Sequence, residues 1–266
     1  ADSDYIDVGT TLNSMLEIGD SFSISAWVNF GNTAADRTII SNFTSAIKGI
    51  QFRVKSNESI RIIFAESSSV YLFVDSSSLA IDTWHHAVFT YDGSNTIGGL
   101  KLYINSILDN NTNGTQGTIT TITSTDSLKI GAYTSGQYFD GHISNASIWN
   151  TELTSAQVTE IYNQGLPGNL NSHSAYSNLV SWWQLGENSS FDGNDWIVAD
   201  EKGTNNGTST GMPVGALVNG VGTTANGLSS GMSEGNLVGD APYSTANAIS
   251  TNMVVTSRVS GSGNTP

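Results

Sequence analysis

The chain has 266 residues, of which 38% are hydrophobic and only 12% are charged, and its formal net charge is −14 at pH 7. Its abundance of Ser, Thr, Asn and Gly favours strands and turns, and it argues against a helical bundle or a doubly wound α/β enzyme. The excess of 23 Asp and Glu over 9 Lys and Arg argues against nucleic acid or an anionic membrane as a partner, whereas it suits Ca²⁺.

The sequence lacks several features that would indicate a disulfide-bonded, thiolate-metal or membrane protein. The chain has no Cys, so neither a disulfide nor a thiolate metal site is expected. No run of about 18 apolar residues is present, so no membrane insertion is expected. The sequence starts at Ala1 without Met or a signal peptide, and we expect a processed start.

Strand patterns recur along the first half of the chain. The segment 21–30 alternates, so that one face carries Phe22, Ile24, Ala26, Val28 and Phe30 and the other carries Trp27. Similar runs follow at 38–41, 49–54, 59–64, 70–74, 84–91, 99–104, 117–123, 128–132 and 137–149. Many short strands at this spacing predict a β-sandwich or barrel. The predicted core comprises Phe22, Ile24, Val28, Phe52, Ile62, Trp84, Val88, Phe89, Leu102, Ile104, Ile130, Ile143, Ile148 and Trp182.

One short helix is predicted over 155–163. Thr154 is its N-cap and Gln157 completes a capping box, whereas Gly165 and Pro167 end the helix. A helix of this length is not stable alone, so we expect it to dock on the sandwich.

The last quarter of the chain changes in character. Residues 179–185 indicate a buried strand, and a polar loop follows. Residues 211–266 contain one Tyr and no Trp or Phe, so they cannot bury a core of their own. We expect an extended arm, disordered when free, that becomes ordered in an assembly. Its short apolar clusters, at 216–218, 237–238 and 253–255, suit strand addition to a neighbour.

Several stretches resemble one family. Residues 84–93, followed by 100–105, are similar to the centre of laminin-G-like domains of the concanavalin A-like lectin/glucanase superfamily. Residues 22–28 resemble the early strand of that family, and 139–153 with the predicted helix resemble its closing strand and helix. The resemblance covers residues 3–210 and implies a jelly roll of two antiparallel sheets.

The order of the motifs departs from that family. In many members a strand like 179–185 comes before the first strand, whereas here it comes after the helix. The arrangement looks circularly permuted, and we expect 179–210 to complete the sheet. The segment 165–211 with the tail also resembles laminin-G-like structural proteins of marine bacterial viruses. We therefore expect one sandwich domain over 1–210 and a Gly/Ser/Asn-rich arm over 211–266.

Catalytic patterns are missing from the sequence. Glycanases of the superfamily need paired carboxylates, usually as Glu-x-Asp-x-(x)-Glu along one strand, and no Glu here sits in that pattern. His85 and His86 point to opposite faces of a strand, which favours packed or hydrogen-bonded rings over catalysis. We therefore expect no enzymatic activity.

Calcium is the cofactor that the sequence suggests. The family resemblance points to the loop with Asp200, Gly203 and Asn206, and Asp4 and Asp140 are partners from the other motifs. Backbone and Asn oxygens are common calcium ligands. The alternative is that these acids are solvated turn residues that cap their own backbone.

Four residues are candidates for contact with a sugar. Trp196 beside Asp195, together with Tyr133 and Tyr138, stands in a loop-like context, and exposed aromatic rings next to polar groups suit sugars. The alternative is packing at the rim or in the core.

Three functions follow from these observations. The first is a non-catalytic structural or adhesive protein of a virion surface, a capsid decoration or fibre component with glycan contacts. It would form a homo-oligomer through its arm. The second is an extracellular carbohydrate-binding module, and the third is a glycoside hydrolase, which the missing carboxylate pattern disfavours.

Overall fold

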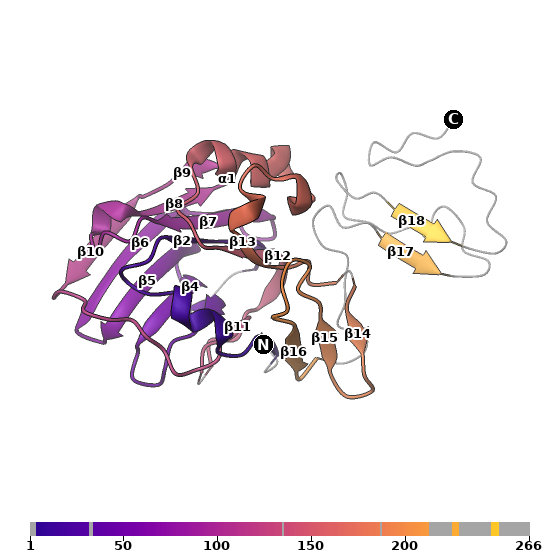
Figure 1. The fold of residues 1–266 in the computed structure, drawn as a ribbon, viewed down its shortest axis with the longest axis horizontal. Coiled ribbons are helices and arrows are strands. Elements are labelled where there is room, and N and C mark those ends of the chain that lie inside the picture. Colours follow the sequence, from indigo (N-terminus) through magenta and orange to yellow (C-terminus); the bar gives the residue numbers. More distant parts are fainter. Residues whose placement is uncertain are drawn as a thin grey trace. The chain divides into compact units, whose positions relative to one another are not determined.

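The predicted all-β sandwich is confirmed. The computed structural model describes residues 4–31, 34–134, 136–186 and 188–212, together with two short strands farther along the chain. The chain divides into two units, Ala1–Ala216 and Leu217–Pro266. The first unit consists of two sheets packed face to face (Figure 1), and neighbouring strands in both sheets are antiparallel.

The larger sheet has ten strands. In spatial order they are β10 (Thr112–Gln116), β6 (Val70–Ser78), β5 (Ser59–Ser67), β4 (Gly49–Val54), β3 (Arg37–Ser41), β11 (Lys129–Ile130), β1 (Tyr5–Asp7), β16 (Gly207–Thr210), β15 (Trp196–Val198) and β14 (Ser190–Phe191). The smaller sheet has six, in the order β13 (Leu179–Trp183), β12 (Gly141–Trp149), β2 (Phe22–Phe30), β7 (His85–Tyr91), β8 (Leu100–Ile104) and β9 (Ile107–Leu108).

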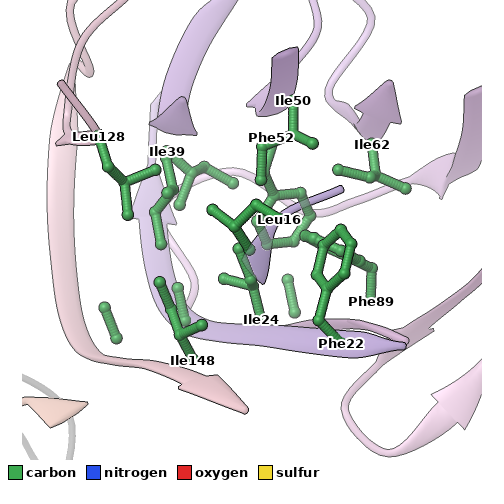
Figure 2. Packing of buried hydrophobic residues seen from close by; sticks show 14 of the residues in the cluster. Leu16, Phe22, Ile24, Ile39, Ile50, Phe52, Ile62, Phe89, Leu128 and Ile148 are labelled. Atoms are coloured by element: carbon green, nitrogen blue, oxygen red, sulfur yellow. The ribbon is translucent and has the colours of Figure 1, made fainter. Parts of the chain in front are cut away.

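The main core lies between the two sheets. As predicted from its alternation, β2 turns Phe22, Ile24, Ala26, Val28 and Phe30 into this core. Figure 2 shows Phe22 and Ile24 facing Ile50, Phe52 and Ile62, with Phe89 beside them. The 3₁₀-helix η1 (Thr11–Met15) leads to Leu16, which is fully buried in the same cluster.

A second layer covers the outer side of the six-stranded sheet. The helix α1 (Ser155–Tyr162) has the predicted capping box between Thr154 and Gln157. It ends earlier than predicted, because Asn163 already adopts a left-handed conformation with φ 45°. Val158 and Ile161 pack on side chains of the sheet in a cluster with Val88, Tyr103, Trp149, Leu153, Leu170, Ala175, Leu179 and Trp182. Four more 3₁₀ segments are η2 (Ile97–Gly99), η3 (Asn163–Gly165), η4 (Leu170–Ser172) and η5 (Tyr176–Asn178).

Two expectations about the sandwich, the strand over 117–123 and Trp84 in the core, are wrong. No strand forms over 117–123, where Ile119 and Ile122 are both buried. Their spacing of three does not fit a strand, and the backbone N–H of Thr120 donates to the carboxylate of Glu66 instead of a neighbouring strand. Trp84, which was expected in the core, is partly exposed and belongs to none of the core clusters, whereas Ile143 is partly exposed but packs against the main core as expected. Trp84 precedes β7, and Ile143 lies toward one end of β12 on the rim of the core.

The second unit is described only in part. Its strands β17 (Ala225–Leu228) and β18 (Ala246–Ile249) pair with each other in parallel. The three apolar clusters predicted to make intersubunit contacts lie outside the described residues, so that expectation stays a prediction.

Within the described part of the chain, no helix has the length and apolar character needed to cross a membrane.

Candidate functional site

The outer faces of the two sheets differ. On the six-stranded sheet, Val88, Tyr103 and Trp182 lie beneath α1 and the 3₁₀ segments. On the ten-stranded sheet, β4, β5 and β6 turn Phe52, Ile62 and Val74 into the core. Their alternate side chains therefore point outward, and no helix among the described residues packs on them. This outward side of the large sheet is the candidate site.

An apolar group occupies part of this face. Phe43, Ile63 and Ala65 are buried there, and Ile47, Tyr71, Phe73 and Tyr133 cover them while staying partly exposed. The rings of Tyr71 and Phe73 are 6.2 Å apart, and those of Phe43 and Tyr133 are 6.0 Å apart. The register between β5 and β6 brings these apolar side chains together, because Ile63 lies opposite Phe73 and Ala65 lies opposite Tyr71.

A charged group adjoins the apolar one. Arg61 binds Asp75 through two hydrogen bonds, from Nε (2.6 Å) and from Nη2 (2.7 Å). Lys55 Nζ donates to the same carboxylate at 2.9 Å. Arg53 Nε lies 3.2 Å from Asp36 Oδ2 in an ion pair. Together with the apolar group, these five side chains form what we call the outer-face patch.

Amide groups connect the charged group to the neighbouring strand and loop. The side-chain Oε1 of Gln51 accepts from Arg53 Nη1 at 2.7 Å. Its Nε2 donates to Thr38 Oγ1 at 2.8 Å and to Gln137 Oε1 at 2.7 Å. Gln51 is thereby fixed, and it fixes Arg53 in turn.

The electrostatics of the outer-face patch are those of a crowded ion-pair network. Burial acts to raise the pKa of Asp75, but the hydrogen bonds and charges of Arg61 and Lys55 outweigh it, so that pKa is lowered. The pKa of Arg53 is also lowered, because burial and the charge of Arg61 outweigh the attraction of the nearby carboxylates. Asp75 is therefore ionised at neutral pH and is not a proton donor for general acid catalysis.

The four residues predicted to contact sugar have different surroundings. Tyr133 belongs to the outer-face patch, and its hydroxyl donates to the Thr44 carbonyl at 3.1 Å. Tyr138 stacks on Tyr5 with ring centroids 6.4 Å apart. Trp196 instead packs against the main core, with its ring 5.4 Å from that of Phe191. Asp195 lies between β14 and β15, where its backbone N–H donates to Asp192 Oδ1.

The five residues predicted to bind calcium do not form one cluster. Asp200, Gly203 and Asn206 lie in the loop between β15 and β16, where the Asp200 N–H donates to Asn206 Oδ1 at 2.9 Å. Asp4 precedes Tyr5, which pairs with Thr210 at the opposite end of β16, about 13 Å of strand away. Asp140 is exposed and directly precedes β12.

The carboxylate of Asp200 is itself hydrogen-bonded. It accepts from the backbone N–H groups of Trp182 (2.9 Å), Lys202 (3.1 Å) and Asn205 (3.1 Å). No group of three or more His, Cys, Asp or Glu within the described ranges is placed to hold a metal ion. Calcium would have to replace some of these hydrogen bonds, and its binding here stays a prediction.

The variant Asp200→Asn separates the two interpretations of this loop. We expect it to cost about 1–3 kcal/mol of unfolding free energy, because the amide NH₂ faces backbone donors. Thermal unfolding of both proteins in excess EDTA and in excess Ca²⁺ is the measurement. A calcium site predicts that Ca²⁺ raises the melting temperature of the wild type and not of the variant. Equal melting temperatures of the wild type in the two buffers would contradict the calcium prediction.

The histidine pair is packed, as the sequence indicated. His86 is fully buried, its ring stacks on Trp27 at 4.9 Å, and its Nε2 lies 3.2 Å from Ser25 Oγ. His85 Nε2 hydrogen-bonds the Ala80 carbonyl at 2.8 Å. The two rings occupy different environments and do not act together.

The charged group was missed at the level of sequence, although a signal was present. Gln51, Arg53 and Lys55 alternate with the core residues Phe52 and Val54, so that a polar face could be read from the strand. What the sequence does not reveal is which strands lie beside it and in what register.

Several solved structures are similar to this one. A protein of Bacteroides ovatus ATCC 8483 to which carbohydrate binding is ascribed matches with a TM-score of 0.58 and 20% identity, over 79% of this chain and 56% of that one. The present chain therefore spans little more than half the length of that protein. The carbohydrate-binding domain CBM40 of the Ruminococcus gnavus IT-sialidase matches with a TM-score of 0.49 and 13% identity, over 60% of this chain and 92% of that one.

The SAP-like pentraxin of Limulus polyphemus matches with a TM-score of 0.45 and 13% identity, over 74% of this chain and 85% of that one. No curated protein matches this chain. The family model described as the concanavalin A-like lectin/glucanases superfamily matches residues 1–159. With the two antiparallel sheets, this match shows that the chain belongs to the laminin-G-type family of that superfamily.

Proposed function

We propose that this protein is a non-catalytic carbohydrate-binding module whose glycan lies on the outer-face patch. The observation that carries the proposal is the meeting of partly exposed rings with guanidinium, ammonium and carboxylate groups on a sheet face that no described helix covers. The likeness in fold to the Bacteroides ovatus protein supports it.

The chemistry of the outer-face patch suits a sugar in two ways. The C–H face of a pyranose packs on aromatic rings, and Tyr71 and Tyr133 present such rings at the surface. Sugar hydroxyl groups both donate and accept, and they find donors in Arg53 and Lys55 and acceptors in Asp36. The network fixes these polar groups before a ligand arrives, which lowers the entropic cost of binding.

We expect no catalysis at the outer-face patch. Glycoside hydrolysis needs one carboxyl group that donates a proton and a second that acts as a base or nucleophile. Of the two carboxylates in the outer-face patch, Asp75 is held ionised by Arg61 and Lys55. Asp36 is likewise paired with a cation, Arg53. Both carboxylates of the patch are therefore engaged in ion pairs, and we expect binding without turnover of the glycan.

Removal of one ring is the direct test of this function. Tyr71→Ala is expected to weaken binding of an oligosaccharide selected on a glycan array by about tenfold, because the stacking surface is lost. The control is Tyr176→Ala, since Tyr176 packs against the cluster beneath α1 on the other side of the sandwich. Isothermal titration calorimetry gives the affinities. Equal losses in the two variants, or none in either, would contradict the proposal.

The role at a virion surface stays a separate prediction. It depends on the arm over 211–266 and its apolar clusters, which lie outside the described residues, and none of the similar structures named above is a viral structural protein. We place the module outside the cell, where glycans are displayed. Contact with other subunits through the arm would be an addition to glycan binding.

A further inference from the structure

The outer-face patch concentrates positive charge in a strongly acidic chain. The protein carries 9 Lys and Arg against 23 Asp and Glu. Three of these nine cations, Arg53, Lys55 and Arg61, meet in the patch, and the carboxylates that pair with them among the described residues are Asp36 and Asp75. The patch is thus locally positive by one charge, whereas the chain as a whole is negative by 14.

Two of the cations lie directly opposite each other. Arg53 on β4 pairs in register with Arg61 on β5. Opposed residues of neighbouring strands have Cβ atoms about 4.5–5.5 Å apart, and like charges at that separation repel. Asp75 binds both Arg61 and Lys55. Asp36 binds Arg53 and also accepts from the backbone N–H of Ser56. The repulsion between the two guanidinium groups is therefore only partly offset within the protein.

Both arginines keep donors for a further acceptor. Arg61 uses Nε and Nη2 on Asp75, and Arg53 uses Nη1 on Gln51. Arg53 Nε faces Asp36 in an ion pair but makes no hydrogen bond within the described residues. Within the described residues, Arg61 Nη1 and Arg53 Nη2 make no hydrogen bond to the protein. Their side chains are 18% and 16% exposed, so an acceptor can reach them from solvent.

The guanidinium groups are also held in place. The Arg61 guanidinium lies over the Phe73 ring, 3.8 Å from its centroid. Phe73 lies against Gly114 of β10, where a Cβ atom would come within 2.8 Å of the ring. Each guanidinium group is planar, and its fork of donors matches the geometry of a carboxylate or sulfate group.

We propose that the outer-face patch selects glycans carrying an anionic group, a carboxylate or a sulfate ester, bound between Arg53 and Arg61. This inference rests on the proposed function and adds the ligand class. Burial and the charge of Arg61 lower the pKa of Arg53, and the negative charge of a bound anion would act in the opposite direction. The neutral sugar rings would still pack on Tyr71 and Tyr133.

The test compares matched charged and neutral ligands. The carboxylate pair is an oligogalacturonate and its methyl-esterified form, and the sulfate pair is a sulfated galactan oligosaccharide and its desulfated form. Calorimetry on the full chain is expected to show at least tenfold tighter binding of the charged member in one pair or both. The preferred pair identifies the anionic group.

Two controls tie that preference to the arginines. Arg53→Gln is expected to abolish the preference for the charged ligand. Lys101→Gln removes a cation of β8 that is paired with Glu152, and this variant is expected to keep the preference. Thermal unfolding checks that both variants fold. For the wild-type protein, raising NaCl from about 50 mM to about 500 mM should weaken binding of the charged ligand and leave binding of the matched neutral ligand unchanged.

The outcomes separate the two proposals. Equal binding of charged and neutral members with loss in Tyr71→Ala overturns the anionic inference and leaves glycan binding standing. A preference that survives Arg53→Gln also overturns the inference. Failure to bind any member of either pair, with no other glycan bound on the array, overturns both proposals.

Discussion

Replacement of Trp183 by Ala is expected to lower the free energy of unfolding by about 3–5 kcal/mol, which is a large part of the stability of a typical domain. Trp183 is fully buried in the main core, and its indole N–H donates to the Asn205 carbonyl at 2.8 Å. The variant would leave both a cavity and an unpaired carbonyl group. Chemical denaturation measures the change.

The matched control is Trp84→Ala. Trp84 is partly exposed and lies outside both large core clusters, so we expect a smaller loss. A similar cost for both variants would contradict the assignment of Trp183 to the core. Deletion of 165–211 extends the test, because it removes β13 from the edge of one sheet and β14, β15 and β16 from the other. That deletion should prevent folding, whereas truncation after Gly211 should not.

Acidification is the second condition with a large expected effect. Burial lowers the pKa of His86 to about 3 from an ordinary 6.5. Between these values the unfolded chain binds a proton that the folded chain excludes, so stability rises with pH across this window. Above about pH 6.5 His86 is neutral in both states and its titration takes nothing from the free energy of unfolding. As the pH falls toward 3, the free energy of unfolding decreases. The loss is about 2 kcal/mol at pH 5 and on the order of 4–5 kcal/mol at the acid limit.

The measurement is the free energy of unfolding at pH 8 and pH 5 for the wild type and for His86→Gln. Carboxylates with ordinary or lowered pKa values stay mostly ionised at pH 5, so the difference between the two proteins reports on His86. The variant loses stability at both pH values because the stack on Trp27 is disturbed. Its dependence on pH should nevertheless be smaller by about 2 kcal/mol. An equal pH dependence in both proteins would show that His86 titrates normally.

Local patterns in the sequence predicted most of the sandwich. The alternation of 22–30 placed one face of β2 in the core, and the capping box at Thr154 placed the start of α1, because both depend on residues close in sequence. The strand expected over 117–123 failed because tertiary contacts of Ile119 and Ile122 overrode local propensity.

The candidate site was less predictable than the fold. Its residues come from Asp36, β4, β5, β6 and the loop with Tyr133, and only the register of the strands brings them together. The exposure of a single aromatic side chain is also hard to predict from sequence. Trp196 was a candidate either for sugar contact or for packing, and it packs against the main core while staying partly exposed. A sequence indicates which residue types alternate on a strand, whereas neighbours across the sheet depend on the completed topology.

A chemical-shift map of the glycan complex is the most direct test of the account. The full chain, labelled with ¹⁵N, would be titrated with the tightest ligand found on the array. We predict that the largest changes fall on β4, β5 and β6, including the amides of Arg53, Arg61 and Tyr71. Changes confined to α1 and the 3₁₀ segments of the opposite layer, or to the β14–β15 hairpin around Trp196, would contradict the assignment of binding to the outer-face patch.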